Sequence, residues 1–178
     1  MKAIISDATA LIVLAKLGRL ELLKELFSSV IIPYHVQQEI QQKSDYDLGV
    51  WNELFFTVMI VQDRKLLTSL ELFLDAGESE AITLAKELDL PLLIDEKKGR
   101  KIAQTMHIEI IGLVGIIVAL QRRKILSGNE AIQLIDEAQK IGFRLSDKLY
   151  KEFCKIVMNP SEKLERIAKA QAIDPIEE

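Results

Sequence analysis

The sequence predicts an α/β fold, a three-layer α/β/α sandwich built on a mainly parallel central sheet of four to five strands. Short apolar runs alternate with longer stretches of helical periodicity, which is the pattern of βαβ units. The chain has 178 residues, about the length of one domain. Hydrophobic residues make up 49% of it, enough to fill one large core.

The first predicted strand spans residues 2–6 and is expected at the centre of the sheet. Its continuous apolar run, Ala3-Ile4-Ile5, is typical of a strand that is buried on both faces. Four more strands are predicted at 30–32, 55–61, 91–94 and 108–111. Helices are predicted at 8–17, 19–27, 33–43, 48–54 and 99–106, and over 65–90 with a break near Gly77.

Three further helices, at 113–124, 129–140 and 146–157, complete a predicted domain over residues 1–158. Beyond it, residues 159–178 become charged and lose their large apolar side chains, so they are predicted to form a C-terminal extension or tail.

Composition excludes several classes of protein. The net charge is −4, so any nucleic acid must be bound through local basic patches. The single cysteine, Cys154, rules out an internal disulfide and a thiolate metal site, and its apolar surroundings predict a buried thiol. The longest apolar run, 110–120, is too short to cross a bilayer, and no signal sequence is evident. A cytoplasmic protein with no membrane partner is therefore expected.

Acidic residues follow several of the apolar segments. Asp7 ends the first strand, Asp95 and Glu96 end the strand at 91–94, and Glu78 and Glu80 lie where a helix is expected to begin. Carboxylates near buried strand ends are costly unless something compensates their charge, and a divalent cation does so. Ligands also bind at the carboxyl ends of parallel strands. The pattern predicts an acidic pocket for Mg²⁺ or Mn²⁺, as in many enzymes that cut phosphodiesters.

Each acid also has a simpler interpretation. Asp7, and one of Asp95 and Glu96, would serve as helix N-caps. Glu78 and Glu80 would stabilise a helix dipole from its first turn. Glu39 lies among polar neighbours on a predicted helix and would be a solvated surface residue.

A basic cluster lies directly beside Asp95. It consists of Lys97, Lys98, Arg100 and Lys101, which are predicted to bind RNA through its phosphates or, alternatively, to form a solvated helix face. Ser6 and Thr9 are predicted to hydrogen-bond a metal ligand or a water.

Six motifs in order resemble those of the PIN-domain superfamily, in particular a prokaryotic PIN-like family formerly of unknown function. The resemblance covers about residues 1–155. The motifs are Ile5-Ser6-Asp7-Ala8-Thr9-Ala10-Leu11-Ile12; Ile32-Pro33 with Val36 and Glu39-Ile40; Gly77-Glu78-Ser79-Glu80-Ala81-Ile82; Leu93-Ile94-Asp95-Glu96-Lys97-Lys98-Gly99-Arg100; Ile111-Gly112-Leu113-Val114-Gly115; and Gly142-Phe143-Arg144-Leu145-Ser146-Asp147.

This resemblance implies an α/β/α nuclease whose acids bind Mg²⁺ or Mn²⁺. Asp7, Glu39, Glu80 and Asp95 match the four metal-binding and catalytic acids, with Glu96 as an alternative to Asp95 and Glu78 as a further candidate. Glu80 departs from the family, which usually has Asp at that position. The implied activity is metal-dependent cleavage of single-stranded RNA that leaves 5′-phosphate and 3′-hydroxyl ends.

The resemblance further implies the toxin half of a toxin–antitoxin pair. The expected partners are therefore RNA, a small cognate antitoxin protein and a second copy of the chain. One alternative is a PIN-like module that binds nucleic acid or a partner with weak or no catalysis. A phosphohydrolase or phosphoacceptor domain is disfavoured because Thr9 stands where a second Asp would be needed.

Overall fold

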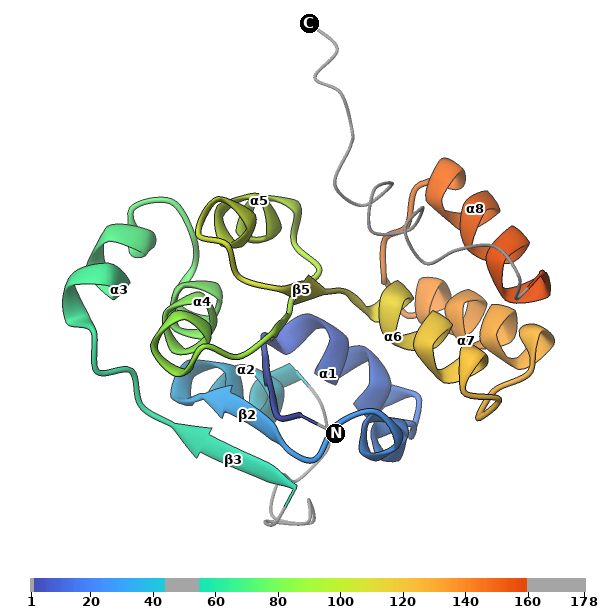
Figure 1. Cartoon of the computed structure of the whole chain (residues 1–178), viewed down its shortest axis with the longest axis horizontal. Coiled ribbons are helices and arrows are strands. Elements are labelled where there is room, and N and C mark those ends of the chain that lie inside the picture. The colour runs from blue at the N-terminus through green and yellow to red at the C-terminus, as the bar shows by residue number, and fades with distance from the viewer. Residues whose placement is uncertain (1, 44–54, 160–178) are drawn as a thin grey trace, which may run out of the picture. The chain divides into compact units, whose positions relative to one another are not determined.

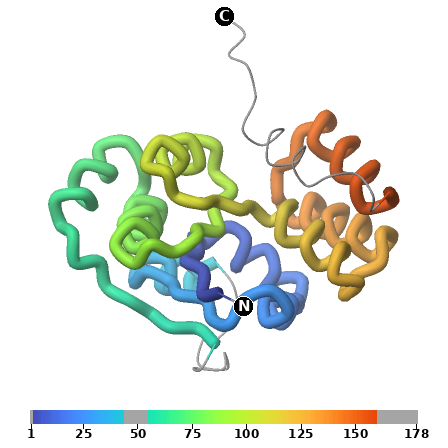
Figure 2. Tube along the Cα trace, viewed as in Figure 1, coloured from blue at the N-terminus to red at the C-terminus, as the bar shows by residue number. Residues whose placement is uncertain are grey.

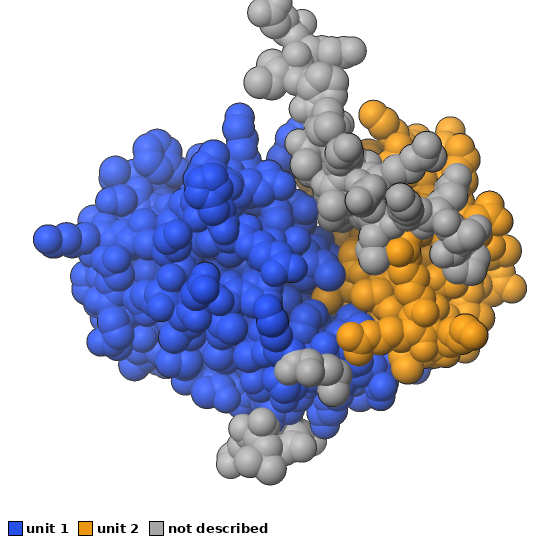
Figure 3. Space-filling model, in the orientation of Figure 1, with its two compact units in different colours: residues 1–113 blue, residues 114–178 orange. Residues whose placement is uncertain are grey.

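The computed structural model describes residues 2–43 and 55–159 (Figure 1). The chain divides into two compact units, residues 1–113 and 114–178, here called the N-terminal unit and the C-terminal unit (Figure 3). The boundary between the units follows Leu113, two residues after β5 (Ile110–Ile111), and the course of the chain can be followed in Figure 2. The predicted boundary between a domain and a tail at 158/159 stays a prediction, because residues 160–178 lie outside the described part.

The N-terminal unit contains a five-stranded sheet in which every described pair of neighbours is parallel. Its order is β3-β2-β1-β4-β5, so the first strand is central, as predicted. The strands are β1 (Ile4–Ser6), β2 (Val30–Pro33), β3 (Phe56–Met59), β4 (Leu92–Leu93) and β5 (Ile110–Ile111).

Helices connect these strands by crossovers. They are α1 (Ala8–Lys16), the 3₁₀-helix η1 (Leu20–Glu25), α2 (Tyr34–Lys43), α3 (Arg64–Glu71), α4 (Ala76–Leu88) and α5 (Lys97–Thr105). The path β1-β2-β3 runs outward in one direction and the path β4-β5 in the other. Because such crossovers are right-handed, α1 and α2 lie on one face of the sheet and α3, α4 and α5 on the other. The three-layer α/β/α prediction is confirmed.

Burial follows the pleat of the sheet. Ile5 pairs with Leu92, and both belong to a core that also contains Leu67 of α3, Ile82 of α4 and Ala103 of α5. Ile4 points to the opposite face and is equally buried. The central strand is therefore apolar on both faces, which fixes its position and that of the residue after it.

The C-terminal unit is helical where it is described. Helix α6 (Leu113–Arg122) starts at the last residue of the N-terminal unit, and α7 (Gly128–Lys140) and α8 (Asp147–Met158) follow. A side chain at Gly128 would meet the carbonyl oxygen of Val157 at 2.7 Å, so glycine allows the close approach of α7 and α8. Cys154 is only partly buried, because the stripe that packs inward consists of its neighbours Phe153, Ile156 and Val157.

Two predicted boundaries differ from the structure. The helical stretch over 65–90 breaks at residues 72–75, and Asp75 caps α4 through the backbone N–H of Glu78. The helix predicted at 19–27 is a shorter 3₁₀-helix. The predicted helix at 48–54 lies outside the described residues. None of the described helices is long and apolar enough to cross a membrane.

Candidate functional site

The two strands at which the sheet order reverses are each followed by an aspartate. Asp7 comes directly after β1, and Asp95 follows β4 after a single residue. The backbone N–H of Asp7 donates to the carbonyl of Leu93 at 3.0 Å, which ties the two strand ends together. In open α/β sheets this reversal creates a crevice at the carboxyl ends of the strands, where ligands bind. The fold therefore brings Asp7 and Asp95 to a ligand-binding position.

Asp7 is held rigidly and is almost fully buried. Its carboxylate caps α1 by accepting the backbone N–H of Thr9 at 3.2 Å, and only 3% of the residue is exposed. Burial raises its pKa well above the usual 3.8, and the negative charges of Asp95 and Glu78 raise it further. Hydrogen bonds from the backbone N–H groups of Asp95 and Thr9 only partly oppose this rise.

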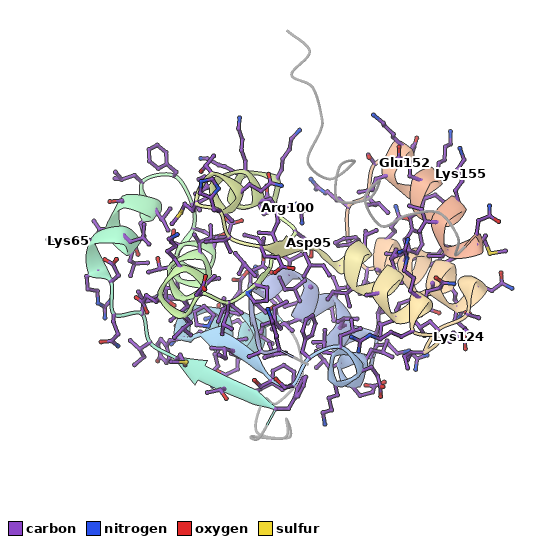
Figure 4. All side chains as sticks on the ribbon, in the orientation of Figure 1. Lys65, Asp95, Arg100, Lys124, Glu152 and Lys155 are labelled. Carbon is purple, nitrogen blue, oxygen red and sulfur yellow. The ribbon has the colours of Figure 1, made fainter. Side chains whose placement is uncertain are left out.

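Asp95 is stabilised by a helix start and by a cation. The backbone N–H of Leu113, the first residue of α6, donates to both carboxylate oxygens at 3.0 and 3.2 Å. The Arg100 guanidinium lies beside the carboxylate (Figure 4) and donates to the carbonyl of Ile94 at 2.8 Å. Burial raises the pKa of Asp95 to about 6, against the opposing effects of Leu113 and Arg100.

Glu78 is a third acid, and its charge acts on Asp7. It lies in the first turn of α4, is 9% exposed, and its buried Oε1 has no hydrogen-bond partner among the described residues. Burial raises its pKa to about 7, and the charges of Asp75, Glu96 and Glu39 add to the rise. A buried carboxylate oxygen without a partner is costly, so this atom is suited to meet a cation.

Two glycines give these acids room. A Cβ at Gly112 would lie 2.7 Å from Asp95 Oδ1 and 2.9 Å from Arg100 Nη1. A Cβ at Gly99 would lie 3.2 Å from Glu78 Oε1. Both glycines occur in the motifs quoted above, but sequence reasoning assigned them no role. The signal was a glycine placed at a strand end or in a helix next to acidic residues.

Glu39 and Glu80 lie beside this cluster with partners of their own. Glu39 accepts a hydrogen bond from Lys43, and its Oε2 would be 3.3 Å from a Cβ at Gly77. Glu80 accepts the backbone N–H of His35 at 3.1 Å, and its other oxygen lies 2.6 Å from His35 Nδ1. The structure thus joins Glu80 to the start of α2, whereas Glu78 acts electrostatically on Asp7. That Glu39 and Glu80 bind metal stays a prediction.

The remaining predicted residues fall into two groups. Ser6 is buried and donates its hydroxyl to the carbonyl of Asp7, and Thr9 reaches Asp7 through its backbone. Glu96 is exposed at the N-cap of α5 and makes no side-chain capping bond. In the basic cluster, Arg100 is partly buried beside Asp95, and the other members, Lys97, Lys98 and Lys101, are exposed on α5.

The chemistry of these acids suits a hard divalent cation. All donors are carboxylate oxygens, three of the carboxyls have raised pKa values, and one buried oxygen is unpartnered. As the side chains stand in residues 2–43 and 55–159, no three His, Cys, Asp or Glu side chains form a metal-holding group.

Comparisons with known proteins found similarity to one sequence family and to one solved structure. The sequence model of a family described as a PIN domain matches residues 3–159. A PilT N-terminus domain protein from the hyperthermophilic archaeon Sulfolobus solfataricus P2 has a similar structure, with a TM-score of 0.44 and 18% identity. The similarity covers 67% of this chain and 92% of that one. No curated protein matches the sequence.

Proposed function

This chain belongs to the PIN-domain family, whose members are generally nucleases, and from that premise we propose that it is a metal-dependent endoribonuclease that cuts single-stranded RNA. One observation carries the proposal. Asp7 lies buried and Asp95 partly buried at the reversal point of the sheet, and burial together with the charges of Asp95 and Glu78 raises the pKa of Asp7. Burial and mutual repulsion destabilise such a cluster of carboxylates when no cation is present, and a bound cation stabilises it.

The ion would be held by Asp7, Asp95 and Glu78, with Mg²⁺ or Mn²⁺ as the expected metal. When bound, such an ion lowers the pKa of a water and offsets charge that builds on the phosphoryl oxygens. The sequence predicted Glu39 and Glu80 as ligands as well, but the set proposed here leaves Glu80 out, because its carboxylate contacts His35. The charge of Glu39 contributes to the raised pKa of Glu78.

The chain's own groups keep the acids in place during hydrolysis. The Leu113 N–H fixes both oxygens of Asp95, and the N-cap bond to Thr9 fixes Asp7. In the reaction the oxygen of water bonds to phosphorus while the bond from phosphorus to O3′ breaks. The fragments then carry a 5′-phosphate and a 3′-hydroxyl. The partly buried Arg100 supplies a fixed positive charge beside the acids.

Cleavage of RNA is the direct test. Purified full-length protein is incubated with mixed cellular RNA and Mn²⁺, with EDTA and the Asp7→Asn variant as controls. The proposal predicts cleavage that both controls abolish. Cleavage that survives both controls points to a contaminating nuclease, and the proposal then has no support. No cleavage with any divalent metal contradicts it.

We also propose that the enzyme is the toxin of a toxin–antitoxin pair, which rests on the family resemblance. A neighbouring reading frame that encodes a small protein with a DNA-binding pattern would support this role. Expression of the chain alone should then arrest growth, and Asp7→Asn or co-expression of the small protein should restore it. Growth that is unaffected by the active chain contradicts the toxin role and leaves the nuclease proposal standing.

A second candidate function is a binding module without catalysis. The observation that favours it is that cations of the protein already engage the acids, Arg100 beside Asp95 and Lys43 on Glu39. Binding of RNA with no cleavage under Mg²⁺ or Mn²⁺ would favour this module over the nuclease.

A further inference from the structure

An aromatic ring and a lysine lie together on the surface close to the acidic cluster. In the turn between α3 and α4, Leu74 packs into the core while Phe73 stays 59% exposed and Leu72 75% exposed. The Lys98 ammonium lies over the Phe73 ring, 6.0 Å from its centroid. Two chain segments that are separate in sequence thus combine an exposed π-face with a positive charge.

Each member of this pair is close in sequence to a residue of the candidate site. Phe73 is two residues before Asp75, which caps α4 through the N–H of Glu78. Lys98 immediately precedes Gly99, the residue that packs against Glu78 Oε1. The ring therefore lies close in sequence to the start of α4, which carries Glu78, and the ammonium lies beside the ring.

The charge on α5 extends this surface. Lys97, Lys98 and Lys101 are all exposed, and the spacings of three and four residues place Lys101 on the same side of the helix as the other two. A π-face beside several exposed lysines is how proteins bind single-stranded nucleic acid, since bases stack on the ring and phosphates meet the cations. A purely apolar protein partner would gain nothing from the lysines.

We propose that Phe73 and Lys98 form a stacking site for an unpaired base of single-stranded RNA, with Lys98 also contacting the adjoining phosphate. The inference rests on the proposed ribonuclease function and deepens it, because it assigns substrate selection to this surface. Duplex RNA keeps its bases stacked within the helix and offers none to the ring. The site therefore selects single strands through an unpaired base.

The test measures RNA binding separately from cleavage. Full-length Asp7→Asn protein is titrated, with Mg²⁺ present, into a short fluorescein-labelled single-stranded RNA, and fluorescence anisotropy reports the Kd. Phe73→Ala and Phe73→Leu should each weaken binding about tenfold, whereas Phe73→Trp should retain it. Duplex RNA of the same sequence should show no dependence on residue 73.

Lysine variants provide a matched comparison. Lys98→Gln should weaken binding and reduce the slope of log K against log salt by about 0.7, the value for one phosphate contact on a single strand. Lys65→Gln removes the same charge from α3 (Figure 4) and should change neither the RNA affinity nor the salt slope. The backbone N–H groups of Gln62 and Asp63 bond to Glu87, so α3 begins beside the far end of α4 from Glu78.

Several outcomes would overturn the stacking site. Unchanged single-strand binding in Phe73→Ala contradicts it, and so does full binding in Phe73→Leu, which would show an apolar contact without stacking. Loss of self-association in Phe73→Ala with RNA binding intact would make the surface a protein interface. If binding depends on Phe73 but the wild-type protein cuts no RNA, the nuclease proposal fails and the stacking site stands.

Discussion

The backbone N–H of Leu113 donates to both carboxylate oxygens of Asp95, at 3.0 and 3.2 Å. This contact joins Asp95, two residues after β4, to Leu113, the first residue of α6. The N–H bond opposes the effect of burial, so the pKa of Asp95 rises only to about 6. The pKa of Asp7 rises well above its usual value, because burial and the charges of Asp95 and Glu78 outweigh its two backbone N–H bonds. The two aspartates therefore differ in pKa, and their titration can be measured.

Without metal, stability should fall as the pH rises from 5 to 8. The pKa values of Asp95 and Glu78 are raised in the folded protein, to about 6 and about 7. Their contribution to stability is fully present below the unfolded pKa values and is lost as the pH rises through the folded ones. The free energy of unfolding should drop by on the order of 2 kcal/mol.

Urea denaturation in EDTA at a series of pH values measures this loss. Glu78→Gln should flatten the profile near pH 7, because it removes one of the titrating groups. A wild-type profile that is flat between pH 5 and 8 would show that the acids are not destabilised by their surroundings.

Asp7→Asn should stabilise the metal-free protein at pH 8 by about 1–2 kcal/mol. The substitution removes a buried charge and its repulsion with Asp95 and Glu78, and Asn still accepts the capping bond from Thr9. Thermal denaturation in EDTA provides the measurement. Asp63→Asn, at the exposed N-cap of α3, is the matched control and should change little. A destabilised Asp7→Asn protein would mean that the carboxylate is already compensated.

Gly112→Ala should disturb the site around Asp95 and Arg100. The new Cβ would lie 2.7 Å from Asp95 Oδ1 and 2.9 Å from Arg100 Nη1, so both side chains must move. We expect a loss of about 1–3 kcal/mol in stability and cleavage at least tenfold slower.

Gly77→Ala is the graded comparison for this substitution. Its Cβ would meet Glu39 Oε2 at 3.3 Å and Val36 at 3.4 Å, distances that small shifts can absorb. Cleavage rates and melting temperatures of the two variants should differ clearly, and equal effects would show that the space at Gly112 is not specific to the site.

Arg100→Gln should raise the pKa of Asp95 above 6, because the guanidinium charge now lowers it. Carbon-13 NMR of the Asp95 carboxyl group follows this titration directly. Single-strand RNA affinity should fall less than in Lys98→Gln, because Arg100 is partly buried beside Asp95. A variant with an unchanged Asp95 titration and strongly reduced RNA affinity would instead make Arg100 a phosphate contact.

The layout of the fold could be predicted from the sequence because its signals are local. The apolar run Ala3-Ile4-Ile5 identified a strand buried on both faces, and β1 is indeed central. Alternation of strands and helices predicted the parallel sheet. The break before α4 was predicted near Gly77, but it lies just before Ala76, because Asp75 provides the N-cap.

Less of the candidate site could be predicted from the sequence, because the site depends on contacts between residues that are far apart in the chain. The positions of Asp7 and Asp95 followed from strand ends. The choice between Glu78 and Glu80, only two residues apart on α4, depends on which way each side chain points. His35 on α2 draws Glu80 away, and the glycine at position 99 makes room for Glu78. Neither contact can be deduced from the spacing of residues in the sequence.

Direct measurement of metal binding tests the central claim, that Asp7, Asp95 and Glu78 together hold the divalent ion. Isothermal titration of Mn²⁺ into the full-length protein compares the wild type with Asp7→Asn and Glu78→Gln, and uses Glu80→Gln as the matched control on the same helix. We expect Asp7→Asn and Glu78→Gln to weaken binding at least tenfold, and Glu80→Gln, which loses a contact to His35, to leave it within about twofold. Strong binding that persists in Glu78→Gln and is lost in Glu80→Gln would contradict it.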